Sequence, residues 1–123
     1  MPEWVDSFVR LEKHIVAALE HSQGTHEVQD VADQIAIGDL QLWPAKDTVA
    51  ITQLIAYPRK KVLHVFLAGG TQAELKQMEP YVVEWAKNQG CTSITSTGRM
   101  GWAKSEMRSI GYRPTHVMIS KDI

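Results

Sequence analysis

Apolar residues in the first third of the chain recur at three- and four-residue steps, the period of a helix with one buried stripe. Over residues 4–19 these positions are Trp4, Val5, Phe8, Leu11, Ile15, Ala18 and Leu19. The same period returns over 28–36, where Thr25 can act as the N-terminal cap and Gly38 suits the left-handed C-terminal position. The pattern predicts a pair of helices.

From residue 40 onward the pattern changes to that of β-strands. The stretch "LQLWP" (40–44) alternates and stops at a proline, and two β-branched apolar runs follow, "TVAITQLIAY" (48–57) and "KVLHVFLA" (61–68). The three runs predict an antiparallel meander.

Helical spacing returns over residues 71–90, where Thr71 and Glu74 have the pattern of a capping box and Gly90 marks the end. Pro80 lies inside this segment and predicts either a kink or the start of its main part. Three short segments follow, predicted as a strand, a helix ending at Gly111 and a last strand: "CTSITST" (91–97), "MGWAKSEMRSI" (100–110) and "YRPTHVMIS" (112–120).

The predicted order is α-α-β-β-β-α-β-α-β, in which the two late helices connect neighbouring strands by crossovers. Such crossovers join parallel strands, so we expect an α/β (α+β) fold with a mixed, mostly antiparallel sheet flanked by about four helices. A chain of 123 residues is long enough for one core. We therefore expect a single domain over residues 1–123.

Composition and charge narrow the classes of partner. The net charge of −1 supplies no global field for nucleic acid or an anionic membrane. Arg59, Lys60 and Lys61 form a basic cluster where two strands reverse; such hairpin tips are usually charged, and nucleic-acid contact is the alternative. No apolar run reaches the roughly 20 residues of a spanning helix, and residues 1–10 lack a basic signal-peptide start. The lone Cys91 forms no internal disulfide, so we expect a soluble, cytoplasmic protein without specific nucleic-acid or membrane partners.

The predicted order, together with "KNQGCTSIT" (87–95) and "GRMGWAKSEMRSIGYRP" (98–114), resembles the GNAT superfamily of N-acetyltransferases, and most closely its small GNAT-like members from tailed phages and prophages. The resemblance implies that the third strand of the meander splays from its neighbour. Pantetheine of acetyl-CoA would lie in that gap, between residues 63–70 and 92–98. A phage-encoded member would work in the host cytoplasm or associate with the virion, with a phage or host protein as partner.

The chain departs from the family pattern at two places. Active members carry Arg or Gln, two spacers and Gly-x-Gly or Gly-x-Ala before the central helix, and successive amides there hold the pyrophosphate. Here that loop is reduced to Gly69-Gly70-Thr71. When the last helix is aligned on Gly111 and Tyr112, Met107 stands where the family has a proton-donating Tyr, and a thioether cannot donate a proton.

The candidate site residues follow from this resemblance, and each has a structural alternative. Leu67, Gly69, Gly70 and Thr71 would contact the cofactor, or the two glycines and the Thr form only a capped turn. His64 could act as a base with Glu84 or Glu106, or be a polar residue on a half-exposed strand.

Two further sets of candidates lie near the end of the chain. Tyr112 and Ser105 are hydroxyl-bearing residues near Met107 in the sequence, and Tyr112 is the catalytic candidate. Arg99 and Trp102 could bind an anion or an acidic partner, or form surface packing. The five histidines show no metal-ligand spacing, so no metal site is expected.

Two functions remain open at this point. The first is a non-catalytic binding or assembly module with weak or absent acetyl-CoA binding, favoured by the reduced loop and by Met107. The second is an acetyl-CoA-dependent N-acyltransferase acting on an amine. Exposed sheet edges also suggest a homodimer.

Overall fold

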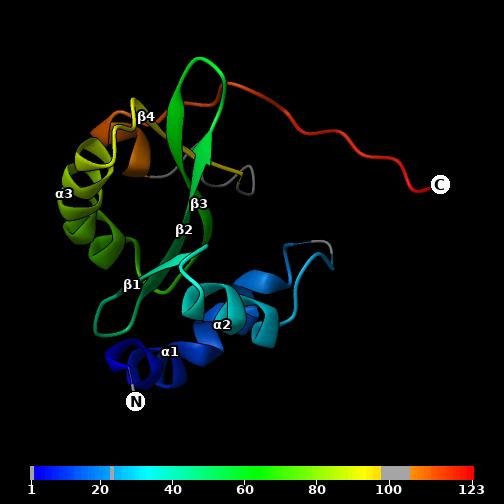
Figure 1. The fold of residues 1–123 in the computed structure, drawn as a ribbon, viewed down its shortest axis with the longest axis vertical. Coiled ribbons are helices and arrows are strands. Elements are labelled where there is room, and N and C mark those ends of the chain that lie inside the picture. Colours follow the sequence, from blue (N-terminus) through cyan, green and yellow to red (C-terminus); the bar gives the residue numbers. More distant parts are fainter. Residues whose placement is uncertain (1, 23, 98–105) are drawn as a thin grey trace.

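The computed structural model describes residues 2–22, 24–97 and 106–123, except for the Glu106 side chain (Figure 1). The elements in these ranges are α1 (Glu3–Leu19), α2 (Val28–Ala36), β1 (Gln41–Pro44), β2 (Val49–Ala56), β3 (Lys61–Gly69), α3 (Gln72–Asn88), β4 (Ser93–Ser96) and the 3-10 helix η1 (Glu106–Ile110). The two early helices, the three-strand meander and the long third helix are all predicted by the sequence periodicity.

The strands form a mixed sheet in the order β1-β2-β3-β4. Both β1 with β2 and β2 with β3 are antiparallel, as predicted for the meander, while β4 returns parallel to β3 after the α3 crossover. In the register between β2 and β3, Ile51 pairs with Leu67 and Thr52 with Val65. Phe66 is therefore the extra residue of a β-bulge in β3, and it packs against the core beneath α1.

Helices cover the two faces of the sheet, and a separate core lies under each layer. Side chains of α1 and α2 pack on one face, against Val49, Ile51 and Leu67. On the opposite face α3 places Val82 and Ala86 against Leu63. Figure 1 shows α3 on the side of the sheet away from α1 and α2. Because side chains alternate along a strand, residues 62 and 64 point to the face opposite α3.

The second helix begins later than its predicted cap. The residue before Val28 is Glu27, whose backbone N–H donates to Asp30 Oδ2 at 2.8 Å. Thr25 is hydrogen bonded to His26 instead, so the Thr25 prediction is wrong. Gly38 adopts the predicted left-handed conformation, with φ of +88°. The third helix begins as predicted, because Thr71 Oγ1 accepts from Glu74 N at 3.2 Å, and it continues through Pro80 to Asn88.

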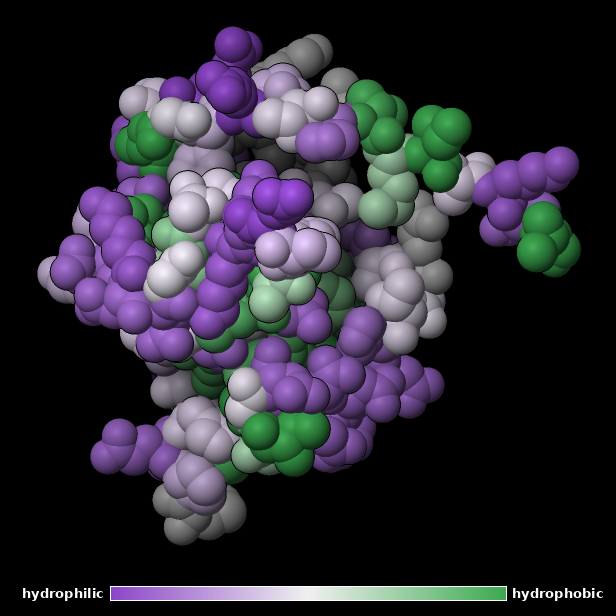
Figure 2. Space-filling model, turned by 45° about the horizontal axis from the view of Figure 1, so that its top comes forward, coloured by the Kyte–Doolittle hydropathy of each residue, from purple (hydrophilic) through white to green (hydrophobic). Residues whose placement is uncertain are grey.

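The C-terminal prediction is wrong for the last strand. Residues 112–123 form no strand, and the chain runs past β4 into solvent (Figures 1 and 2). Their β-branched composition favours extended backbone, but a strand also needs a neighbour with which to exchange hydrogen bonds. Of the predicted helix over 100–110, residues 106–110 form η1, and the part up to residue 105 lies outside the described ranges.

Candidate functional site

The gap expected between β3 and β4 corresponds to a change in strand pairing. Strand β4 pairs only with the first half of β3, from Val62 with Ser93 to Val65 with Ser96. Strand β3 then continues to Gly69 and stays paired with β2 alone, after the bulge at Phe66. Within the described residues, the second half of β3 therefore lacks a neighbour on its β4 side.

The two glycines at the end of β3 are required by close packing. A Cβ atom added to Gly69 would lie 2.9 Å from the carbonyl oxygen of His14 in α1. At Gly70, where φ is +117°, an added Cβ would lie 2.4 Å from the carbonyl oxygen of Asp47. Both distances are too short for real Cβ contacts, and the positive φ disfavours any side chain at residue 70. The glycines thus let α1 and the β1–β2 turn approach β3 closely.

The amide and hydroxyl of Thr71 are engaged inside the protein. Thr71 N donates to Oγ1 of Thr48 at 2.9 Å, and Thr71 Oγ1 accepts from Glu74 N. Thr48 is fully buried and is the last residue of the β1–β2 turn, directly before β2. The Gly69-Gly70-Thr71 segment is consequently joined to the β1–β2 turn by the buried hydroxyl of Thr48.

A carboxylate completes this junction. Glu74 accepts from Thr48 Oγ1 at 2.8 Å and from the backbone N–H groups of Lys46 and Asp47 at 3.0 and 3.1 Å. The Thr48 hydroxyl, and after it the two amides, lower the pKa of Glu74 below its ordinary value. Glu74 is therefore ionised at neutral pH in the first turn of α3. A negative charge already occupies the helix end that would attract a pyrophosphate.

The fourth cofactor candidate, Leu67, lies in the core. Its side chain is 6% exposed and packs with the residues beneath α1. Only its backbone can face a ligand in the gap.

His64 is half-buried on the sheet face opposite α3. Its Nδ1 atom lies 2.9 Å from Thr95 Oγ1, on the neighbouring residue of β4. Burial lowers the pKa of the imidazole, so His64 is neutral at pH 7. Glu84, the partner considered from the sequence, lies on α3 at the other face, and Thr95 takes its place.

Tyr112 and His64 are not brought together. The Tyr112 hydroxyl donates to Glu79 Oε1 of α3 at 3.4 Å. Burial and the neighbouring Glu79 charge raise the pKa of this phenol far above its ordinary value. The Tyr112 hydroxyl thus keeps its proton and is hydrogen bonded to α3, whereas His64 faces away from α3.

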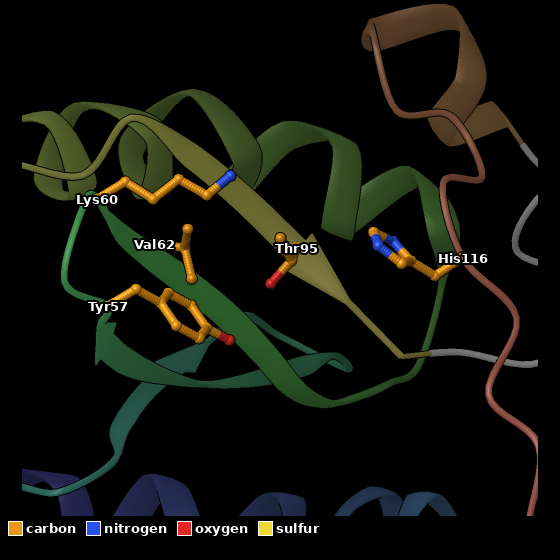
Figure 3. A pocket seen from close by; sticks show the side chains of 5 residues that line it. All are labelled: Tyr57, Lys60, Val62, Thr95 and His116. Atoms are coloured by element: carbon orange, nitrogen blue, oxygen red, sulfur yellow. The ribbon is translucent and has the colours of Figure 1, made fainter.

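The sequence did not predict a hollow that lies on the sheet face opposite α3, the face that carries His64. It has a volume of about 300 Å³ and is lined by Tyr57, Lys60, Val62, Thr95 and His116 (Figure 3). Figure 3 shows Val62 and Thr95 projecting from neighbouring strands, with the His116 ring directed from the C-terminal segment toward Thr95. No sequence signal joins residues 57 and 116, because their proximity depends on the path of the chain after η1.

No protein-family model matches the chain, and no curated protein does. Several solved structures share its fold. An aminoglycoside acetyltransferase, meta-AAC0020, from an uncultured soil metagenomic sample, solved with sisomicin, superposes with a TM-score of 0.66 at 8% identity, covering 94% of this chain and 88% of that one. A GNAT family acetyltransferase from Staphylococcus aureus gives 0.59 at 10% identity, with coverage of 96% and 93%. An acetyltransferase from Trypanosoma brucei gives 0.58 at 13% identity, with coverage of 79% and 78%.

The fold is GNAT-like. At these identities the similarity concerns the fold alone, a fold that those acetyltransferases also have. The sequence resemblance implies cofactor contacts at Leu67, Gly69, Gly70 and Thr71. In the structure Glu74 lies beside this turn, in the first turn of α3.

Several candidates fall on residues that the structure does not describe. Arg99, Trp102 and Ser105 lie outside the described ranges. Met107 lies in η1. Among the described residues, no three His, Cys, Asp or Glu side chains come together as a metal site. None of the described helices is long and apolar enough to cross a membrane.

Proposed function

We propose that this protein is a non-catalytic GNAT-like binding or assembly module, of phage type, whose acetyl-CoA site is degenerate. The observation that carries the proposal is the Glu74 carboxylate, which occupies the first turn of α3 and is held there by Thr48 and the amides of Lys46 and Asp47. The phage-type assignment rests on the sequence resemblance of residues 98–114.

The local geometry works against pyrophosphate in two ways. Thr71 N already donates to Thr48, so this amide is engaged. The incoming phosphates would also meet the ionised Glu74 side chain at the helix end that should attract them. Each charge-assisted hydrogen bond contributes about 1.5 to 3 kcal/mol, so losing two or three weakens binding by on the order of a thousandfold.

The positions of the catalytic candidates support the same reading. A transferase needs a base and a proton donor near one acyl group. His64 faces away from α3, while the Tyr112 hydroxyl is bound to Glu79 on α3. A partner protein, of phage or host origin, is the expected ligand of such a module.

The test is isothermal titration with acetyl-CoA and with CoA. We expect no saturable heat below about millimolar ligand, given the roughly thousandfold weakening. Glu74→Gln removes the charge and should tighten whatever binding exists, whereas Glu84→Gln, an exposed position further along α3, should not. Micromolar binding by the unaltered protein would overturn the proposal.

One alternative keeps a specific observation in its favour. Two features fit an acetyl-CoA-dependent N-acyltransferase acting on an amine: the second half of β3, which has no described neighbour on its β4 side, and the neutral His64 beside Thr95. In that case His64→Ala should reduce turnover at least roughly tenfold without lowering the melting temperature, because a positioned base contributes that much or more. Thr95→Val is the matched control, since it removes the hydrogen bond but leaves the imidazole.

A further inference from the structure

The outer edge of β4 is unpaired in the described part of the chain. Strand β4 is the last of the sheet order, and its pairing from Ser93 to Ser96 is with β3 only. The Ser93 hydroxyl is buried and has no hydrogen-bond partner among the described residues. An edge of this kind is a template for another strand.

An apolar segment near the end of the same chain is exposed to solvent among the described residues. Val117, Met118 and Ile119 are 79%, 73% and 90% exposed, although all three are strongly apolar. Figure 1 shows the C-terminal segment leaving the body of the molecule, and Figure 2 shows hydrophobic residues on this projecting part. Three consecutive exposed side chains of this size are unfavourable for an isolated monomer.

The path of the chain keeps this segment away from its own β4. The Tyr112 hydroxyl is bound to Glu79 on the α3 side of the sheet. Four residues later, His116 lines the hollow on the opposite face, next to Thr95. Residue 116 thus lies beside β4 on the face opposite α3, and residues 117–123 extend away from there without forming a strand with β4.

We propose that residues 117–123 of one chain pair with the β4 edge of a second copy, and that the exchange is reciprocal. A second copy needs no rearrangement of Tyr112 or His116, because it approaches the segment where it already extends. Donor strand and acceptor edge both occur on every copy, so a two-fold symmetric pair satisfies both at once. Seven residues are enough to cover a four-residue edge.

This proposal is independent of acetyl-CoA binding. Self-association through β4 can fail while the cofactor site remains degenerate, and a cofactor can bind while the exchange persists. The titration described above and the association experiment below therefore report on different parts of the molecule.

The test is sedimentation velocity over a concentration series, with Ile119→Pro as the disrupting variant. Proline removes a backbone N–H needed for strand pairing, while residue 119 is 90% exposed and makes no demand on the fold of the single chain. Ile119→Thr is the matched control, because it keeps the N–H and a β-branched side chain. We expect the unaltered protein to dimerise and Ile119→Pro to weaken the dimer at least roughly tenfold more than Ile119→Thr does.

Hydrogen exchange on the same samples locates the contact. Amides 93–96 and 117–120 should become protected together as the protein concentration rises. A protein that stays monomeric overturns the proposal, whether or not these amides are protected, because protection in a monomer means pairing within one chain. A dimer insensitive to Ile119→Pro also overturns it.

Discussion

Replacing Gly70 by Ala separates a packing role of the glycine pair from a ligand-binding role. The new Cβ would lie 2.4 Å from the Asp47 carbonyl oxygen and 2.6 Å from the Thr48 Cα atom. Both are backbone atoms, so the β1–β2 turn itself has to move. The residue would also have to hold a φ of +117°, which an L side chain rarely adopts.

The two costs can be worked out separately. Holding a non-glycine residue in such a conformation costs on the order of 1 to 3 kcal/mol. Forcing a methyl group into a filled site costs about 1 to 3 kcal/mol. We therefore expect Gly70→Ala to lower the free energy of unfolding by about 2 to 6 kcal/mol, a large part of the roughly 5 to 15 kcal/mol of an ordinary domain.

Two matched variants isolate the two causes. Gly38→Ala has a similar positive φ of +88° but no atom within 4 Å of the added Cβ, so it should cost only about 1 to 2 kcal/mol. Gly69 has no positive φ, but a Cβ atom there would lie 2.9 Å from the His14 carbonyl oxygen. Overpacking in Gly69→Ala should therefore lower the free energy of unfolding by about 1 to 3 kcal/mol.

Urea denaturation of the four proteins, followed by tryptophan fluorescence, measures these differences. The reasoning is refuted if Gly70→Ala is no less stable than Gly38→Ala. That result would mean that the β1–β2 turn yields easily and that the glycine is there for another reason, such as the approach of a ligand to the backbone.

Two other predictions concern the groups on either side of the sheet. Thr48→Val should destabilise the protein by about 1 kcal/mol, since Thr71 N loses its acceptor. The same change should raise the pKa of Glu74 toward its ordinary value, because the carboxylate loses the Thr48 hydroxyl. NMR titration of the Glu74 carboxyl measures this pKa, and an unchanged value would contradict the hydrogen-bond assignment. The lowered pKa of His64 means that the unfolded chain binds more protons than the folded one below about pH 6.5. Stability should therefore be fully present above that pH and decline as the pH falls through the folded-state pKa. His64→Gln should flatten this decline in denaturation curves measured at several pH values, whereas the exposed His21→Gln should not.

The sequence by itself determined the elements whose signals are local. The apolar periods of α1, α2 and α3, the alternation of the meander and the Thr71 cap depend on residues within a turn or two of one another, and the structure confirms them. The parallel return of β4 also follows, because a helical crossover leaves few other arrangements.

Tertiary structure decided what each of these groups contacts. Glu74 has the sequence position of a capping-box residue, yet its carboxylate binds the β1–β2 turn, some 27 residues away in the chain. Gly69 and Gly70 resemble a phosphate loop in sequence, but their Cβ positions are filled by α1 and by the Asp47 and Thr48 backbone. No periodicity encodes such distant contacts.

The C-terminal segment shows that a local strand pattern is not sufficient to form a strand. Residues 112–120 have the composition of a strand, but a strand exists only where a second strand supplies hydrogen bonds. In the single chain, Tyr112 and His116 carry the backbone past β4, and Val117 to Ile119 remain exposed. The sequence determines that this segment is able to pair, and the three-dimensional path of the chain determines that it does not pair with its own β4.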